Sequence, residues 1–227
     1  MTVRNIRFRQ SVIRTVLGLA AVSGLAMQPV ESAFAKVVEV SMTAVETKLV
    51  IDGEGHTYDA WTFNGQFPGP VIRVQEGDEV VFSLTNPETN GRPHSMDFHA
   101  AETNFLEHYK EVRPGESLQY RFKAKWPGIF AYHCGASPMI QHIARGMMGA
   151  IIVDPKDPKA LPKADREYVL VQSELFKDPD DVDGMFDRKY QHVVFNGSVF
   201  RYDPVHSKAG GDFLDAKPGE RVRLYFV

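Results

Sequence analysis

The feature that most constrains the fold of this chain is a series of short β-rich runs separated by turns that contain proline and glycine. Turn signals such as Phe67-Pro68-Gly69-Pro70 and Trp126-Pro127-Gly128 separate the runs. After residue 36 no stretch shows a 3.6-residue apolar period over a helix-sized window. The pattern predicts an all-β sandwich or barrel. The runs lie at 37–40, 71–74, 79–84, 117–122, 129–133 and 150–153.

The N-terminus has the three-part pattern of a cleavable signal peptide. Arginines 4, 7, 9 and 14 precede an apolar run at 16–27, and Ala33-Phe34-Ala35 supplies the small residues that signal peptidase recognises. The apolar run is too short to span a bilayer. We therefore expect residues 1–35 to be removed after Ala35 and the mature chain to be exported, in bacteria to the periplasm.

The chain contains one cysteine, Cys134, and its net charge is −3. No dense stripe of lysine and arginine follows, so a nucleic-acid partner is not expected. An oxidising compartment favours disulfides, but a lone cysteine cannot pair within its own chain. Cys134 is therefore a free thiol, an intermolecular bridge or a metal ligand.

The neighbours of Cys134 favour the metal ligand. His142 and Met147 follow it at Cys-x7-His-x4-Met spacing, so a single loop between two strands can supply three ligands. His94 comes from another part of the chain and completes the set. A thiolate, two imidazoles and a weak thioether are the ligands of a blue (type 1) copper centre. Structural zinc would require a stronger fourth ligand than methionine.

Strand geometry separates a second pair of histidines from this centre. Successive side chains in a strand point to opposite faces, so His133 and Cys134 cannot easily face the same metal. His94 and His99 are an odd number of residues apart and diverge in the same way. We therefore expect a second copper, bound by His99 and His133, on the other side of the strand.

The second centre is incomplete within this sequence. Catalytic metal sites usually have three protein ligands and one open position, so the third ligand comes from another domain or subunit, or there is no second metal. Asp97 lies next to His99 and has the character of a proton donor to a metal-bound oxyanion, although a turn or surface carboxylate is an equal alternative.

The remaining histidines have no partner at ligand spacing, and Met139 is an alternative to Met147 as the axial ligand, although its position inside the loop favours a shielding role. We expect packing or surface roles for the histidines, shielding of the first centre by Met139, and packing in the following strand for Met148. The histidines are His56, His108, His192 and His206.

A second part of the chain resembles the first. A linker rich in Pro, Lys and Asp begins near residue 154, Phe63-Asn64-Gly65 recurs as Phe195-Asn196-Gly197, and the segment 77–82 (GDEVVF) recurs as 219–224 (GERVRL). Chance similarity between turn segments is the alternative. We therefore expect a complete domain at 36–155, followed at 156–227 by a linker and the truncated start of a second, similar domain.

Three segments resemble the first domain of copper-containing nitrite reductases. They are 94–101 (HSMDFHAA), 127–134 (PGIFAYHC) and 142–150 (HIARGMMGA). The segment 63–70 (FNGQFPGP) is similar to one shared broadly with multicopper oxidases, and 161–165 (LPKAD) fits the passage into a second domain. The resemblance implies a cupredoxin-like Greek-key β-sandwich or barrel.

The resemblance also implies a function for each site residue. It implies type 1 copper at His94, Cys134, His142 and Met147, type 2 copper at His99 and His133, and Asp97 as the acid that hydrogen-bonds nitrite. Such enzymes reduce nitrite to nitric oxide and take electrons from a small cupredoxin or a cytochrome c. They are homotrimers in which a neighbouring subunit supplies the third type 2 histidine.

One segment departs from the family pattern, and two other functions compete. Residues 102–110 (ETNFLEHYK) replace a loop of glycine and small residues, which bears on access to the site. A laccase-like two-domain multicopper oxidase would need histidines where Asp97 and Tyr132 stand. An electron carrier would use the type 1 centre alone.

Overall fold

The computed structural model describes residues 35–102, 104–206 and 213–227. The expected signal peptide, apart from Ala35, lies outside these residues. Among the residues that are described, no helix is long and apolar enough to cross a membrane.

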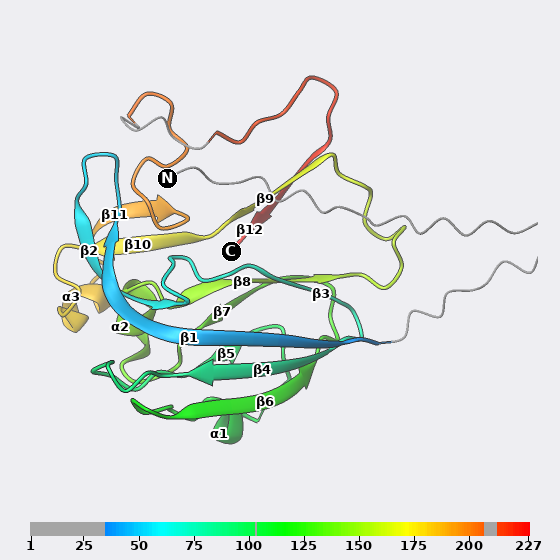
Figure 1. Cartoon of the computed structure of the whole chain (residues 1–227). Coiled ribbons are helices and arrows are strands. Elements are labelled where there is room, and N and C mark those ends of the chain that lie inside the picture. Colours follow the sequence, from blue (N-terminus) through cyan, green and yellow to red (C-terminus); the bar gives the residue numbers. More distant parts are fainter. Residues whose placement is uncertain (1–34, 103, 207–212) are drawn as a thin grey trace, which may run out of the picture. The chain divides into compact units, whose positions relative to one another are not determined.

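Two four-stranded sheets form the first part of the chain (Figure 1). In the first sheet the order is β2-β1-β4-β6, and in the second it is β3-β8-β7-β5. The strands of the first sheet are β1 (Val37–Val50), β2 (Thr57–Phe63), β4 (Glu79–Thr85) and β6 (Ser117–Lys123). The strands of the second are β3 (Ile72–Gln75), β5 (Asp97–Phe98), β7 (Gly128–His133) and β8 (Met148–Asp154).

An aromatic core joins the two sheets. Phe82 of β4 packs edge-to-face against Phe98 of β5, with ring centroids 5.0 Å apart. Phe98 also contacts Phe122 of β6 at 5.0 Å and Tyr132 of β7 at 5.5 Å. In β6 the residues that face this core alternate with exposed ones, as expected for a strand with one buried face. The predicted all-β sandwich is thus confirmed.

Within the part of the chain that the structure describes, three short helices interrupt the strands: α1 (Phe105–His108), α2 (Met139–Ala144) and α3 (Val182–Phe186). Sequence periodicity could not reveal them, because each is shorter than two turns of helix. The predicted loop between β7 and β8 therefore contains α2. Gly146 follows this helix, and its φ of 111° suits glycine and lets the chain turn back toward β8.

The second part of the chain repeats the strand pairing of the first. In the first part, β1 pairs antiparallel with β2 (Ala44 opposite Phe63) and parallel with β4. In the second part, β10 (Gln172–Phe176) pairs antiparallel with β11 (Tyr190–Phe195), with Gln172 opposite Phe195, and β9 (Arg166–Leu170) pairs parallel with β12 (Val222–Phe226). The similarity of the two segments thus extends from sequence to strand pairing.

In the turn after β2 and in the turn after β11, an asparagine side chain accepts the same kind of hydrogen bond from the backbone. Asn64 and Asn196 have positive φ values of 57° and 50°, which asparagine tolerates better than most residues. Asn64 Oδ1 accepts a hydrogen bond from Thr43 N–H at 2.7 Å, and Asn196 Oδ1 accepts one from Val171 N–H at 2.8 Å. The recurring Phe-Asn-Gly motif therefore encodes one local structure twice.

The second part packs against the β1–β2 hairpin through a second apolar cluster, to which both parts contribute. The hydroxyl of Tyr58 donates to the carbonyl of Ala144 in α2 at 3.2 Å, which ties β2 to the helix. Arg73 of β3 also forms an ion pair with Glu167 of β9 at 2.5 Å. The predicted division at residues 155 and 156 falls between β8 and β9, and the assignment of two domains remains a prediction. The buried members of the cluster are Ile51, Tyr58, Ala60, Phe67, Leu175 and Val194.

Tyr132 lies so close to Gly149 that a methyl group added at position 149 should destabilise the fold. A Cβ at position 149 would lie 2.3 Å from the Tyr132 hydroxyl oxygen, which is held by a 2.6 Å hydrogen bond to Pro70 O. We expect Gly149→Ala to lower the free energy of unfolding by about 1–3 kcal/mol through overpacking. Chemical denaturation of the metal-free protein measures this effect.

Gly91→Ala is the matched control, because its Cβ would lie 3.5 Å from Glu46 Oε2, in ordinary contact. We expect a change of less than about 0.5 kcal/mol for this variant. Equal stabilities for the two variants would contradict the packing assigned to Tyr132.

Candidate metal centres

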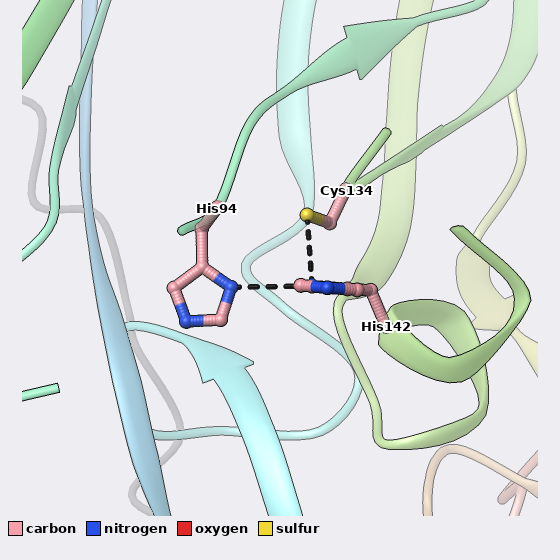
Figure 2. A group of neighbouring side chains, drawn as sticks. All are labelled: His94, Cys134 and His142. Atoms are coloured by element: carbon pink, nitrogen blue, oxygen red, sulfur yellow. Dashed lines mark hydrogen bonds between the residues drawn. The ribbon is translucent and has the colours of Figure 1, made fainter. Parts of the chain in front are cut away.

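Three side chains from different segments of the first part of the chain converge on one buried point (Figure 2). His94 lies between β4 and β5, Cys134 directly follows β7, and His142 lies in α2. The Nδ1 atoms of the two histidines are 3.3 Å apart, and Cys134 Sγ lies 3.3 Å from His142 Nδ1. The three candidate ligand atoms all lie within 4.8 Å of one another, and all three residues are buried.

Hydrogen bonds around this group direct the lone pairs inward. Glu46 Oε1 lies 3.2 Å from His94 Nε2 and accepts a hydrogen bond from its N–H, which leaves the lone pair of the neutral ring on Nδ1. Ser95 N–H donates to Cys134 Sγ at 3.2 Å, and Ser95 Oγ accepts from Gly135 N–H at 2.8 Å. Electron pairs that face one another in a buried site repel until a cation binds between them. The donor set therefore fits a soft metal ion.

Burial changes the protonation of the same three groups in a consistent way. Desolvation lowers the pKa of His142 to about 3 and also lowers the pKa of His94. Both imidazoles are therefore neutral at pH 7 and able to bind a metal. Desolvation raises the pKa of Cys134 to about 11, so the thiol ionises only when a cation compensates its charge. Thiolate with two neutral imidazoles is a donor set that suits copper.

Met147 closes the loop that carries Cys134 and His142. Its carbonyl accepts a hydrogen bond from Cys134 N–H at 2.9 Å, and its own N–H donates to His142 O at 3.0 Å. Its side chain is fully buried, and its role as the fourth ligand remains a prediction. Met148 packs against the second apolar cluster, and Met139 is half exposed at the start of α2.

A second group consists of Asp97, His99 and His133. The Nε2 atoms of the two histidines are 3.0 Å apart, and Asp97 Oδ2 lies 3.5 Å from His133 Nε2 and 3.7 Å from His99 Nε2. Asp97 is opposite His133 in the pairing of β5 with β7, and His99 N–H donates to Ala131 O of β7 at 3.0 Å. The side chain of His99 is 52% exposed, which leaves one side of this group open.

The two groups are joined through one peptide unit. His133 belongs to the second group and Cys134 to the first, as the alternation of side chains predicts. His133 Nδ1 also lies 3.0 Å from Cys134 O and donates a hydrogen bond to it, which leaves the Nε2 lone pair facing His99. A covalent path and a hydrogen bond therefore connect the two groups.

The segment at 102–110 brings Tyr109 to this region. Burial and a hydrogen bond to the Asp97 carboxylate raise the pKa of Tyr109, so its phenol remains protonated. Its ring would lie 3.2 Å from a Cβ at Gly135, beside Cys134. The bulkier sequence of this segment therefore places an aromatic side chain beside Asp97 and Gly135.

The other four histidines join neither group. His56 and His206 are exposed, and their Nδ1 atoms form hydrogen bonds of 2.6 Å with the carboxylates of Asp52 and Asp203. The ring of His108 packs against the ring of Tyr120, with centroids 4.7 Å apart. His192 lies in β11. Across the described ranges, groups of three potential ligands occur at the two places given above.

Sequence reasoning missed the residues that support the ligands. Glu46 bonds to His94 across 48 positions, and no local signal marks it. Trp61 packs against His142 with ring centroids 4.7 Å apart, and Arg145 lies over Trp61. The arginine in 142–147 (HIARGM) was the available clue, because an arginine between two ligands is unusual in a buried segment.

Known copper proteins resemble this chain in sequence and in fold. A multicopper oxidase family model matches residues 44–158. The chain is 38% identical over 204 residues to a copper-containing nitrite reductase of Neisseria gonorrhoeae. The matched region covers 83% of this chain and 48% of that protein. It is 39% identical to the corresponding enzyme of Pseudomonas chlororaphis, across 82% of this chain and 56% of that protein. The chain thus spans about half the length of these curated relatives.

Solved structures show the same relation. The copper nitrite reductase of Nitrosomonas europaea superposes with a TM-score of 0.83 and 57% identity, across 84% of this chain and 67% of that chain. A copper-containing nitrite reductase of Thermus scotoductus superposes with a TM-score of 0.70 and 29% identity, across 85% of this chain and 44% of that chain.

The sandwich and its buried donor set therefore define a cupredoxin-fold protein of the multicopper oxidase class. Within that class, the chain belongs to the family of copper-containing nitrite reductases.

Replacing the thiol tests the first centre. We expect Cys134→Ser, in the copper-loaded protein, to abolish intense visible absorption, because a serine hydroxyl cannot replace the thiolate–copper bond. Some copper should remain bound at the histidines. Visible spectroscopy with metal analysis measures both effects. The control Met148→Leu changes a sulfur side chain that packs elsewhere, and it should retain the colour. Colour that survives in Cys134→Ser would show that the assignment is wrong.

Proposed function

We propose that the protein to which this chain belongs reduces nitrite to nitric oxide and water, with one electron and two protons per nitrite. Electrons enter at the group of His94, Cys134 and His142, with Met147 as fourth ligand, and continue to the group of His99 and His133. The direct bond between His133 and Cys134 carries the proposal, since it connects a buried electron site to a more open one. Bound copper supplies one-electron redox chemistry and polarises the substrate.

Within this scheme, His94, Cys134 and His142 hold the electron-accepting site away from water. All three are buried, which excludes nitrite from that site. The second group is more open at His99 and therefore accessible to a small anion. The separation lets one part of the chain handle electrons and another handle substrate.

Asp97 is the residue proposed to hold a proton for the substrate. Its Oδ2 atom faces both imidazoles of the second group, and the side chain is only 10% exposed. From there it can hydrogen-bond a nitrite oxygen and protonate the oxygen that leaves as water. Tyr109 donates to the same carboxylate, which restricts its orientation.

The remaining parts of the proposal concern the complete protein. Two histidines are one fewer than a catalytic metal site usually has. We propose that a neighbouring subunit of a homotrimer supplies the third histidine. The proposed electron donor is a small cupredoxin or a cytochrome c. The proposed location is the periplasm, after removal of the signal peptide and as part of denitrification.

A laccase-like oxidase is the second candidate, because a multicopper oxidase also superposes on this chain, with a TM-score of 0.69 and 29% identity. A trinuclear cluster would need a ligand at position 132. Tyr132 instead points into the core, where its hydroxyl donates to Pro70 O. This geometry favours the reductase.

Copper analysis of the complete protein separates the candidate functions. We expect two copper ions per chain, one intense in visible absorption and one weak. One ion per chain would indicate an electron carrier, and four would indicate an oxidase. Elemental analysis combined with electron paramagnetic resonance measures both number and type.

Replacing the proposed acid tests the second centre. We expect Asp97→Asn to lower nitrite turnover by about 10²–10⁴-fold, because the amide cannot release a proton to the substrate. The visible absorption of the first centre should be unchanged. The control Asp59→Asn alters an exposed carboxylate that pairs with Lys48. Turnover of Asp97→Asn equal to that of the control would remove Asp97 from the mechanism.

A further inference from the structure

Arg145 is a buried cation beside the first centre whose role the proposed reaction does not explain. The residue is 6% exposed and lies two positions before Met147. Its guanidinium lies over the ring of Trp61, with Cζ 4.5 Å from the ring centroid. Buried arginines are rare unless they are paired, so the partners of this one are informative.

Every nitrogen of the guanidinium has an acceptor from outside α2. Arg145 Nη2 bonds to Asp180 Oδ1 at 2.6 Å, Nε donates to Pro179 O at 3.2 Å, and Nη1 donates to Asp59 O at 3.1 Å. Gln141 Nε2 donates to the same Asp180 oxygen at 3.0 Å. The second part of the chain, just before α3, thus fixes the position of the cation.

Trp61 transmits this position to the histidines. Its ring lies 4.7 Å from the ring of His142 and 5.8 Å from the ring of His94, measured between centroids. The backbone N–H of Trp61 also donates a hydrogen bond to the backbone carbonyl of Arg145 at 3.0 Å. Trp61 therefore contacts both the guanidinium of Arg145 and the imidazole rings of the two candidate ligands.

Water screens the two charges of the Arg145–Asp180 ion pair unequally. The Arg145 side chain is 7% exposed, whereas that of Asp180 is 70% exposed. Water screens an exposed charge far more than a buried one, so the positive charge dominates the field at the first centre. A net positive field favours the state of the centre that carries less positive charge, which is the reduced state.

We propose that Arg145 is a positioning residue of the electron-accepting centre, which holds Trp61 against His142 and raises the reduction potential through its fixed charge. Asp180 moderates that charge and locks the arginine in place. This inference rests on the proposed function, because it assumes copper at His94, Cys134 and His142.

Two substitutions of opposite charge test the proposal by redox titration of the copper-loaded protein. Arg145→Gln removes the cation and should lower the potential. Asp180→Asn retains the Oδ1 acceptor but removes the anion, and should raise it. We expect a change of about tenfold in the electron-transfer equilibrium for Arg145→Gln, which corresponds to about 59 mV for one electron. The shift for the more exposed Asp180 should be smaller.

A role limited to folding would not produce opposite shifts. Damage to packing would move both variants in the same direction or leave the potential unchanged, and either result would overturn the proposal. The control Arg121→Gln removes one positive charge from an exposed ion pair with Glu79, and its potential should equal that of the parent protein.

A metal-free measurement tests the positioning part separately. In a Trp126→Phe background, which removes the exposed tryptophan, fluorescence reports on the buried Trp61. We expect acrylamide quenching of Trp61 to increase severalfold in Arg145→Gln and to stay unchanged in Arg121→Gln. Arg145→Lys should retain most of the potential but increase the quenching, because lysine keeps the charge and lacks the planar stacking surface. Unchanged quenching in both Arg145 variants would refute positioning.

The parent protein distinguishes failure of this inference from failure of the proposed function. A parent without intense visible absorption would refute the copper assignment itself. A coloured parent in which Arg145→Gln and Asp180→Asn leave the potential unchanged would refute only the role of Arg145.

Discussion

The alternation of side chains at the end of β7 is the constraint on which both centres depend. His133 and Cys134 are consecutive and point to opposite sides, so one strand supplies a ligand atom to each of two groups. A shift of β7 by one residue would exchange the two side chains and destroy both groups. The register is fixed by pairing with β8 on one edge and with β5 on the other, where Asp97 lies opposite His133. The same pairing therefore places the proposed acid beside the ligand.

Burial has opposite consequences for the two groups. Around Cys134 it keeps the imidazoles neutral and opposes ionisation of the thiol, so the group is organised for a cation before one binds. Such preorganisation requires partners outside the ligands, and Glu46 and Ser95 provide them through hydrogen bonds. Around His99 the site remains open, as a substrate site must be. The difference in exposure thus separates the proposed electron site from the proposed reaction site.

Much of the arrangement could be predicted from sequence because its determinants are local. The spacing of Cys134, His142 and Met147, and the parity that separates His94 from His99, require only strand geometry. The supporting residues could not be predicted, since Glu46 and Trp61 come from strands distant in sequence and no pattern marks them. The helix α2 was missed because six residues give no measurable period. The repeated Phe-Asn-Gly motif was a weak signal in sequence, yet the same Asn side chain closes both turns.

The Tyr132 hydroxyl has a further consequence for electron transfer. It lies wedged between the backbones at Gly69 and Gly149 and is hydrogen-bonded to Pro70, so the strand immediately before the ligands cannot slide or rotate. Ligand atoms attached to so rigid a support keep nearly the same spacing when the charge between them changes by one unit. For the proposed copper centre, such a rigid support favours a small reorganisation energy, so that electron transfer would require little movement of the protein.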